Sequence, residues 1–255
     1  MKKQKAWINC VVLFQGNKLP LRLVFTPCYM QTTFADQLLQ FYKQLQPPAK
    51  LPRGVGILYP QQDGEVMKLV EKFLQTFFND SNSRRLILGI NPGRFGAGLT
   101  GINFTAPRQL KTNCVIEHLL GNSSELSAEF IYEMIEQYGG TKTFYRDWFI
   151  GAVCPLGFVK EGKNMNYYDD PKLAKAVTPF IVESIQQQLA FNFNTDYCIC
   201  IGGEKNFNFL SGLNEKYHWF QKIIPVPHPR FIMQYRRKEK DNYILQYLAA
   251  LNNEQ

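Results

Sequence analysis

The segment Leu86-Ile-Leu-Gly-Ile-Asn-Pro-Gly-Arg-Phe-Gly96 begins as an apolar run and changes abruptly to glycine, asparagine and proline. Such a change is typical of a buried strand that carries a polar side chain to the rim of a sheet. Pro92 restricts its own φ angle and Gly93 can adopt backbone angles closed to other residues, so the pair would hold the Asn91 amide on a rigid turn. An Asn-Pro-Gly tripeptide on its own also marks ordinary turns, and the rest of the chain must separate the two interpretations.

Three further apolar runs have the same character. They span residues 148–153, 197–201 and 222–226. Helical patterns lie between the runs and around them, at 34–45, 66–77, 108–120, 127–138, 171–189, from 204 onward and near the C-terminus. Apolar strands that alternate with helices indicate a mostly parallel sheet covered on both faces. We therefore predict a three-layer α/β/α fold with a central, mostly parallel four-stranded sheet.

The length of 255 residues suits one well-buried α/β domain. We assign residues 31–255 to this domain and residues 1–30 to an N-terminal extension whose structure the sequence does not define. No apolar run approaches the ~20 residues that span a bilayer, and the N-terminus lacks a clear secretory cleavage pattern. We expect a monomeric cytoplasmic protein with no membrane partner, associated with the nucleoid if the source is bacterial.

The charge balance favours a polyanionic partner. Lys and Arg number 29 against 21 Asp and Glu, a net charge of +8. This excess is compatible with nucleic acid binding, although many basic proteins bind none. The six cysteines are scattered, and Cys198 and Cys200 share one face of an apolar strand, where packing in the core explains them better than an iron–sulfur or zinc site. With only three histidines, we predict no metal and no cofactor.

Polar or glycine-containing segments follow all four predicted strands. They are Asn91, the stretch 151–154, Gly202-Gly203 and His228. Ligands of open α/β sheets bind beyond the carboxyl ends of the strands, so these segments are expected to meet at one crevice.

With these segments the chain resembles the uracil-DNA glycosylase superfamily. The resemblance is strongest to the single-strand-selective monofunctional uracil-DNA glycosylases and their bacterial relatives. The residues that carry the resemblance are Asn91-Pro92-Gly93, Phe95, Thr100-Gly101 and Phe104, followed by His228-Pro229. Weaker matches extend over nearly everything after Met30. The second motif departs from the family, which usually continues His-Pro-Ser-Pro where this chain has Arg230-Phe231 after the proline.

The resemblance implies a monofunctional DNA glycosylase of base excision repair that removes uracil. Other deaminated or 5-modified bases are further candidate substrates, because Gly93 leaves room beside C5 of a pyrimidine. Asn91 would hold the attacking water and His228 would donate a hydrogen bond to the carbonyl of the leaving base. The expected base pocket comprises Ile90, Pro92, Gly93, Phe95, Phe104 and Ala152, with Phe104 stacking on the base. Phe95 could equally be a core residue.

The segment from Arg230 to Lys238 combines cations with apolar and aromatic side chains. By resemblance it is the loop that fills the vacated base stack and binds phosphates, because a base in duplex DNA must first leave the stack. The expected contacts are Arg230, Phe231, Ile232, Tyr235, Arg236, Arg237 and Lys238. A solvated start to the last helix is the alternative interpretation. The expected partner is single- or double-stranded DNA that contains a damaged base.

Ala152 stands where the closest relatives carry an asparagine that reads the edge of uracil, and a methyl group can neither donate nor accept a hydrogen bond. A glycosylase acting mainly on hypoxanthine or xanthine is therefore an alternative. A non-catalytic module that binds damaged or single-stranded DNA is another.

Overall fold

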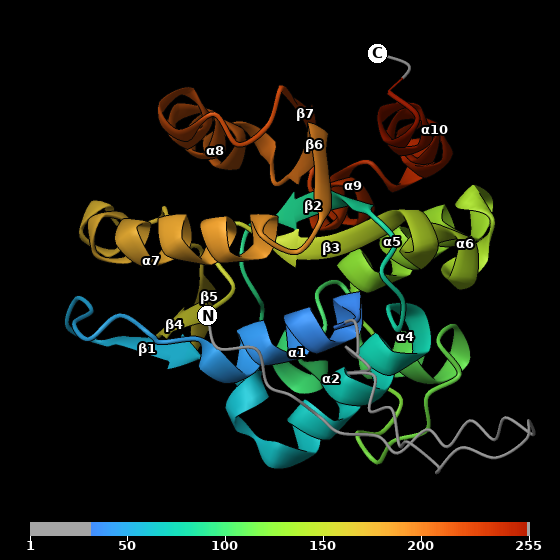
Figure 1. Ribbon diagram of the computed structural model, residues 1–255, viewed down its shortest axis with the longest axis horizontal. Coiled ribbons are helices and arrows are strands. Elements are labelled where there is room, and N and C mark those ends of the chain that lie inside the picture. The colour runs from blue at the N-terminus through green and yellow to red at the C-terminus, as the bar shows by residue number, and fades with distance from the viewer. Residues whose placement is uncertain (1–31, 254–255) are drawn as a thin grey trace, which may run out of the picture. The chain divides into compact units, whose positions relative to one another are not determined.

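Four parallel strands form the central sheet of the computed structural model, which describes residues 32–253. The strands are β2 (Arg84–Gly89), β3 (Trp148–Ala152), β6 (Phe193–Ile201) and β7 (Lys222–Val226), in the order β3-β2-β6-β7. In Figure 1, α7 and α8 lie on one side of this sheet and α5 and α10 on the other. The predicted three-layer α/β/α fold is confirmed. The prediction for residues 1–30 lies outside the described residues.

The helices follow capping signals in the sequence. Thr33 accepts a hydrogen bond from the backbone N–H of Asp36 and forms a capping box with it, and the Asp170 side chain caps α7 by accepting from the backbone N–H of Lys172 and Leu173. The α-helices are α1 (Phe34–Gln44), α2 (Gly64–Phe77), α3 (Ala97–Thr100), α4 (Pro107–Thr112), α5 (Leu126–Tyr138), α6 (Gly140–Asp147), α7 (Pro171–Leu189), α8 (Gly203–Tyr217), α9 (Pro229–Tyr235) and α10 (Lys240–Leu251). Two 3₁₀ turns, η1 (Pro60–Gln62) and η2 (Arg237–Glu239), complete the set.

The expected helix over residues 108–120 is wrong beyond Thr112. Val115 has a φ of 56°, a left-handed conformation that a helix does not continue through. Cys114 and Ile116, on either side of it, are both buried. The backbone thus leaves the helical conformation here, and both side chains are buried although the sequence of the segment has helical periodicity.

Residues 163–165 lie outside the four predicted strands and form one strand of a second sheet. The strands β1 (Val55–Leu58), β4 (Gly157–Lys160) and β5 (Lys163–Met165) pair antiparallel in the order β1-β4-β5. Glu161 and Gly162 join β4 to β5 and have φ angles of 50° and 71°, as a two-residue hairpin turn requires. This hairpin approaches the end of β2 and contributes to the site described below.

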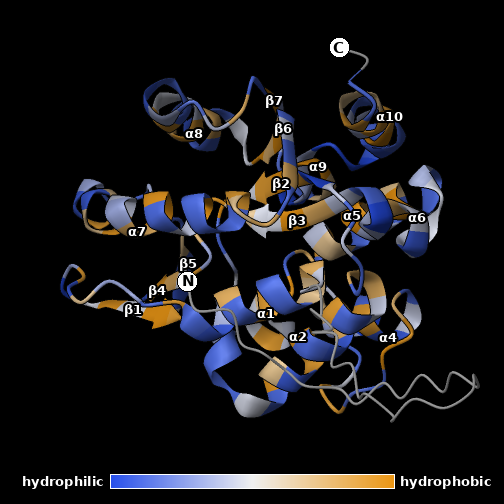
Figure 2. Ribbon diagram, viewed as in Figure 1, coloured by the Kyte–Doolittle hydropathy of each residue, from blue (hydrophilic) through white to orange (hydrophobic). Residues whose placement is uncertain are grey.

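The core lies between the central sheet and its helices. Figure 2 shows hydrophobic strands enclosed by helices that turn hydrophilic residues outward. Cys198 and Cys200 are 0% and 1% exposed, which confirms the prediction that both pack in the core. Among the described helices, none has both the length and the hydropathy that crossing a membrane would require.

Candidate active site

A pocket of about 460 Å³ opens where β2 and β3 end. Backbone pairing continues past both strands, because Val153 N donates to Gly89 O (2.9 Å) and Cys154 N donates to Ile90 O (3.1 Å). The residues that line the pocket and were predicted for it are Ile90, Asn91, Pro92, Gly93, Phe95, Phe104, Ala152, His228 and Arg230. The structure thus brings the two predicted catalytic residues and all six predicted base-pocket residues to one place.

The Asn91 side chain is fixed by the β5 hairpin and the segment after it. Its Oδ1 accepts a hydrogen bond from Tyr167 N (3.1 Å), and its Nδ2 lies 3.3 Å from Met165 O and from Pro92 O. Because Oδ1 has two lone pairs and Tyr167 N uses one, the other can accept from a water. The amide is therefore oriented before any ligand binds.

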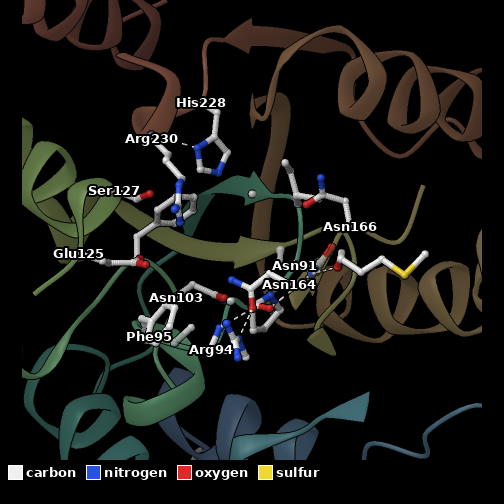
Figure 3. Close-up of a pocket in the computed structure, with 18 of the residues that line it drawn as sticks. Asn91, Arg94, Phe95, Asn103, Glu125, Ser127, Asn164, Asn166, His228 and Arg230 are labelled. Carbon is white, nitrogen blue, oxygen red and sulfur yellow. Dashed lines mark hydrogen bonds between the residues drawn. The ribbon is translucent and has the colours of Figure 1, made fainter. Parts of the chain in front are cut away.

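His228 precedes α9 and caps it. Its Nδ1 accepts a hydrogen bond from Arg230 N at 3.1 Å, so the proton of the neutral ring lies on Nε2. Burial, helped by the positive charge of Arg230, lowers the pKa of His228 to about 4. The other ring nitrogen is directed into the pocket (Figure 3). At neutral pH the site thus contains an uncharged imidazole with one N–H donor available.

Phe104 packs beside His228, with the two ring centroids 5.8 Å apart. Its φ angle is 53°, a left-handed conformation that is costly for a phenylalanine and is often retained where function requires it. Gly89 allows the ring to sit there, because a Cβ at Gly89 would lie 2.7 Å from Phe104 Cε2. Ala152 pairs with Gly89 in the sheet and adds only a methyl group to the pocket wall.

The geometry agrees with the comparisons to known proteins. The family model described as the uracil DNA glycosylase superfamily matches residues 75–252. The chain belongs to this superfamily. It is similar to a solved protein, wild-type Pedobacter heparinus SMUG2, with 46% sequence identity, a TM-score of 0.84, and coverage of 88% of this chain and 98% of that chain. A search of curated proteins finds no match. The family match and the similar solved structure confirm the resemblance seen in the sequence. Members of this superfamily are DNA glycosylases.

The segment predicted to wedge into DNA forms most of α9, and its side chains point to two opposite sides of that helix. Ile232 is fully buried and Met233 is 4% exposed, so the prediction that Ile232 contacts DNA is wrong. The reason is helical periodicity, which turns these two side chains toward the core. Phe231 (44% exposed) and Tyr235 (72% exposed) are four residues apart and lie on the outer face, with Arg236, Arg237 and Lys238 exposed beyond them.

Several pocket residues were not foreseen from the sequence. Asn103, Glu125, Ser127, Lys163 and Asn166 all line the pocket. Burial raises the pKa of the Glu125 carboxyl, and the charge of Arg230 acts in the opposite direction. Glu125 precedes α5 without capping it, and a Cβ at Gly96 would lie 2.5 Å from Glu125 Oε1. No local pattern marks Glu125, because it reaches the pocket only through the packing of α5.

Proposed function

We propose that the protein is a monofunctional uracil-DNA glycosylase. The observation that carries the proposal is the presence of an oriented amide, Asn91, and a neutral imidazole donor, His228, in one pocket that also contains the Phe104 ring. Hydrolysis breaks the bond between C1′ of the sugar and N1 of uracil. Positive charge develops on the sugar while negative charge develops on the departing base.

In this proposal His228 Nε2 donates a hydrogen bond to a carbonyl oxygen of uracil and stabilises the anion as it forms. Its depressed pKa keeps the ring neutral at pH 7, so the hydrogen bond comes from an imidazole and not from an imidazolium. Asn91 Oδ1 holds a water, which forms the new bond to C1′ as the bond to N1 breaks, and the proton that the water loses neutralises the released uracil anion. An amide is a weak base, but an almost free sugar cation needs only a well-placed water.

We propose that the enzyme removes the base without cleaving the DNA strand. Lys163 bears on this point, since a lysine that attacks the sugar would also cleave the strand. Lys163 lines the pocket but is exposed at the β4–β5 turn. An amine nucleophile is normally activated in a desolvated pocket, which this position does not supply. Borohydride should therefore trap no covalent complex between the enzyme and a uracil-containing strand.

The decisive experiment measures alkali-dependent nicking of a uracil-containing oligonucleotide. The wild-type protein should release the base and leave a strand that breaks only after alkali. Asn91→Ala and His228→Ala should each lower the single-turnover rate by roughly a few hundred-fold. Leu119→Ala, an exposed side chain outside the pocket, is the control and should retain the wild-type rate. Absence of nicking at high enzyme concentration, or an Asn91→Ala variant as fast as wild type, would refute the proposal.

Ala152 favours a second candidate activity, excision of hypoxanthine or xanthine. Ala152 itself carries no side-chain amide to read the edge of uracil, and deaminated purines also carry a carbonyl that can accept from His228. Single-turnover rates on uracil, hypoxanthine and xanthine separate the two candidates. Ala152→Asn should shift the preference toward uracil. Monomeric state, strand preference and a location at the nucleoid remain predictions of the same proposal.

A further inference from the structure

Phe95 is an aromatic side chain on the rim of the pocket that the proposed chemistry does not use. It lines the pocket yet is 55% exposed. Phe104 already supplies the ring deep in the pocket, beside His228. An exposed phenylalanine at the mouth of a ligand site has a face free to meet something that lies outside the pocket itself.

Arg94 holds this ring in place. Its guanidinium carbon lies 4.9 Å from the centroid of the Phe95 ring. Arg94 is itself fixed, because its backbone N and its Nε each donate to Asn164 Oδ1 at 3.2 Å. Asn164 belongs to β5, next to Met165, whose carbonyl oxygen accepts from Asn91. The ring and its cation are thus tied to the same hairpin as the catalytic amide, so little conformational freedom is lost when a ligand binds them.

The charge around Phe95 fits a nucleic acid strand. Arg94 and Lys163 line the pocket on this side, and Arg230 lines it on the side of α9. Figure 3 shows Arg94 and Phe95 across the pocket from His228 and Arg230. A strand that delivers one base into the pocket has a phosphate and a neighbouring base on each side of it, so cations and an aromatic face at the rim complement both groups.

We propose that Phe95, held by Arg94, is the stacking platform for the nucleobase next to the excised one, and that Arg94 and Lys163 contact the phosphates on that side. This inference rests on the proposed function, since it requires a DNA base in the pocket. It names the substrate more closely: the neighbouring base must be free to leave its own stack, which a single strand allows at lower cost than a duplex.

The test is a double-mutant cycle in which the Phe95 ring and the DNA base next to uracil are removed separately and together. Single-stranded oligonucleotides carry uracil with a tetrahydrofuran abasic analogue placed immediately 5′ or 3′ to it. Wild-type kcat/KM should fall about tenfold when the base on one of the two sides is absent. Phe95→Ala should show a similar fall on the intact strand and no further fall when that base is removed. Phe95→Trp, which restores an aromatic face, should recover the wild-type sensitivity.

Leu119→Ala is the matched control, because it also removes an exposed apolar side chain but does so outside the pocket. It should keep the wild-type sensitivity to the neighbouring base. Two results would refute the stacking role of Phe95. One is a wild-type kcat/KM that stays unchanged with an abasic analogue on either side, and the other is a fall in kcat/KM for Phe95→Ala as large as that of wild type.

A binding measurement separates this result from failure of the proposed function. Fluorescence anisotropy follows an oligonucleotide with the abasic analogue at the target position, with and without the adjacent base, and needs no excision. Coupling between Phe95 and the adjacent base should appear there too. Coupling without excision would refute only the uracil activity, and excision without coupling in either assay would refute only the platform.

Discussion

His228 both caps a helix and faces the pocket, and its role as the cap needs the neutral form of the ring. Nδ1 can accept from Arg230 N only while it carries no proton. Protonation would remove the cap of α9 and place a charge on a half-buried ring next to the positive charge of Arg230. The depressed pKa of this residue is therefore a property of the folded state that should be measurable as a dependence of stability on pH.

The histidine should destabilise the fold in acid. A folded-state pKa of about 4 against an unfolded value of 6.5 means that the unfolded chain binds the proton first, so stability is lost as the pH falls from 6.5 toward 4. The loss should reach about 3 kcal/mol. His228→Asn keeps a capping acceptor but does not titrate, so it should lack this component. Urea denaturation of both proteins between pH 7 and pH 4 tests this, and parallel stability profiles would contradict it.

Gly89 determines where the Phe104 ring can lie. Gly89→Ala would place a Cβ 2.7 Å from Phe104 Cε2, so the ring must move away from its place beside His228. We expect excision of uracil to slow by at least about tenfold, in keeping with the loss of one stacked base contact. Gly151→Ala on the neighbouring strand is the control, since its Cβ would meet nothing closer than 3.4 Å. Equal rates for the two variants would exclude this role of Gly89.

Local sequence chemistry marked the residues that lie at strand ends, and the family resemblance added Phe95, Phe104 and Arg230. Asn91 and His228 each follow an apolar run and sit beside prolines, so local chemistry marks them. Glu125 and Asn103 have no such mark, because the packing of α5 and the left-handed turn at Phe104 bring them to the pocket. Contacts of that kind depend on tertiary structure and leave no periodic signal.

At the scale of elements, α9 shows how the residues of one predicted segment can divide between two faces of a helix. The stretch was expected to contribute its apolar residues to DNA as a group, but a helix separates them onto two sides. Ile232 is fully buried and Phe231 is 44% exposed. The same composition thus supplies one core contact and one surface contact.

These two residues should respond differently to truncation. Ile232→Ala should lower the free energy of unfolding by about 2–5 kcal/mol, because it leaves a cavity in the core. Phe231→Ala should leave stability unchanged within about 0.5 kcal/mol. It should instead slow uracil excision from duplex DNA more than from single strands, since only a duplex requires the vacated stack to be filled. Equal slowing on both substrates would argue against a wedge at Phe231.

Strands and helices were predicted correctly where a long apolar run or a helical pattern with a capping residue marked them. Short strands were missed where their pairing depends on residues far away in the sequence. The four strands of the central sheet and α7 were expected at nearly their observed positions. The second sheet was not expected, because β1 and β4 are separated by almost one hundred residues and β5 has a polar sequence. Its presence matters for function, since it carries Lys163 and Asn164 to the pocket.

At the scale of the whole molecule, β2 is held in place at both ends. Its far end carries Asn91, and its first residue, Arg84, is buried among several elements. Arg84 donates to both carboxylate oxygens of Asp80 (2.8 Å each) and to Tyr145 O (2.7 Å). Its guanidinium also lies 4.9 Å from the ring centroids of Phe34 and Phe78. One side chain therefore links α1, the segment after α2, α6 and the start of β2.

Loss of Arg84 should weaken the whole fold without altering the chemistry. Arg84→Ala leaves the buried carbonyl oxygen of Tyr145 without this donor and the half-buried Asp80 carboxylate without its cation, at a cost of about 3–5 kcal/mol. Arg146→Ala, which breaks an exposed pair with Asp147, should cost at most about 1 kcal/mol. Because Arg84 does not line the pocket, the folded fraction of Arg84→Ala should excise uracil at the wild-type rate at low temperature. Chemical denaturation and single-turnover assays on both variants give the comparison. A large loss of rate in fully folded Arg84→Ala would show that the anchor positions Asn91 as well as stabilising the sheet.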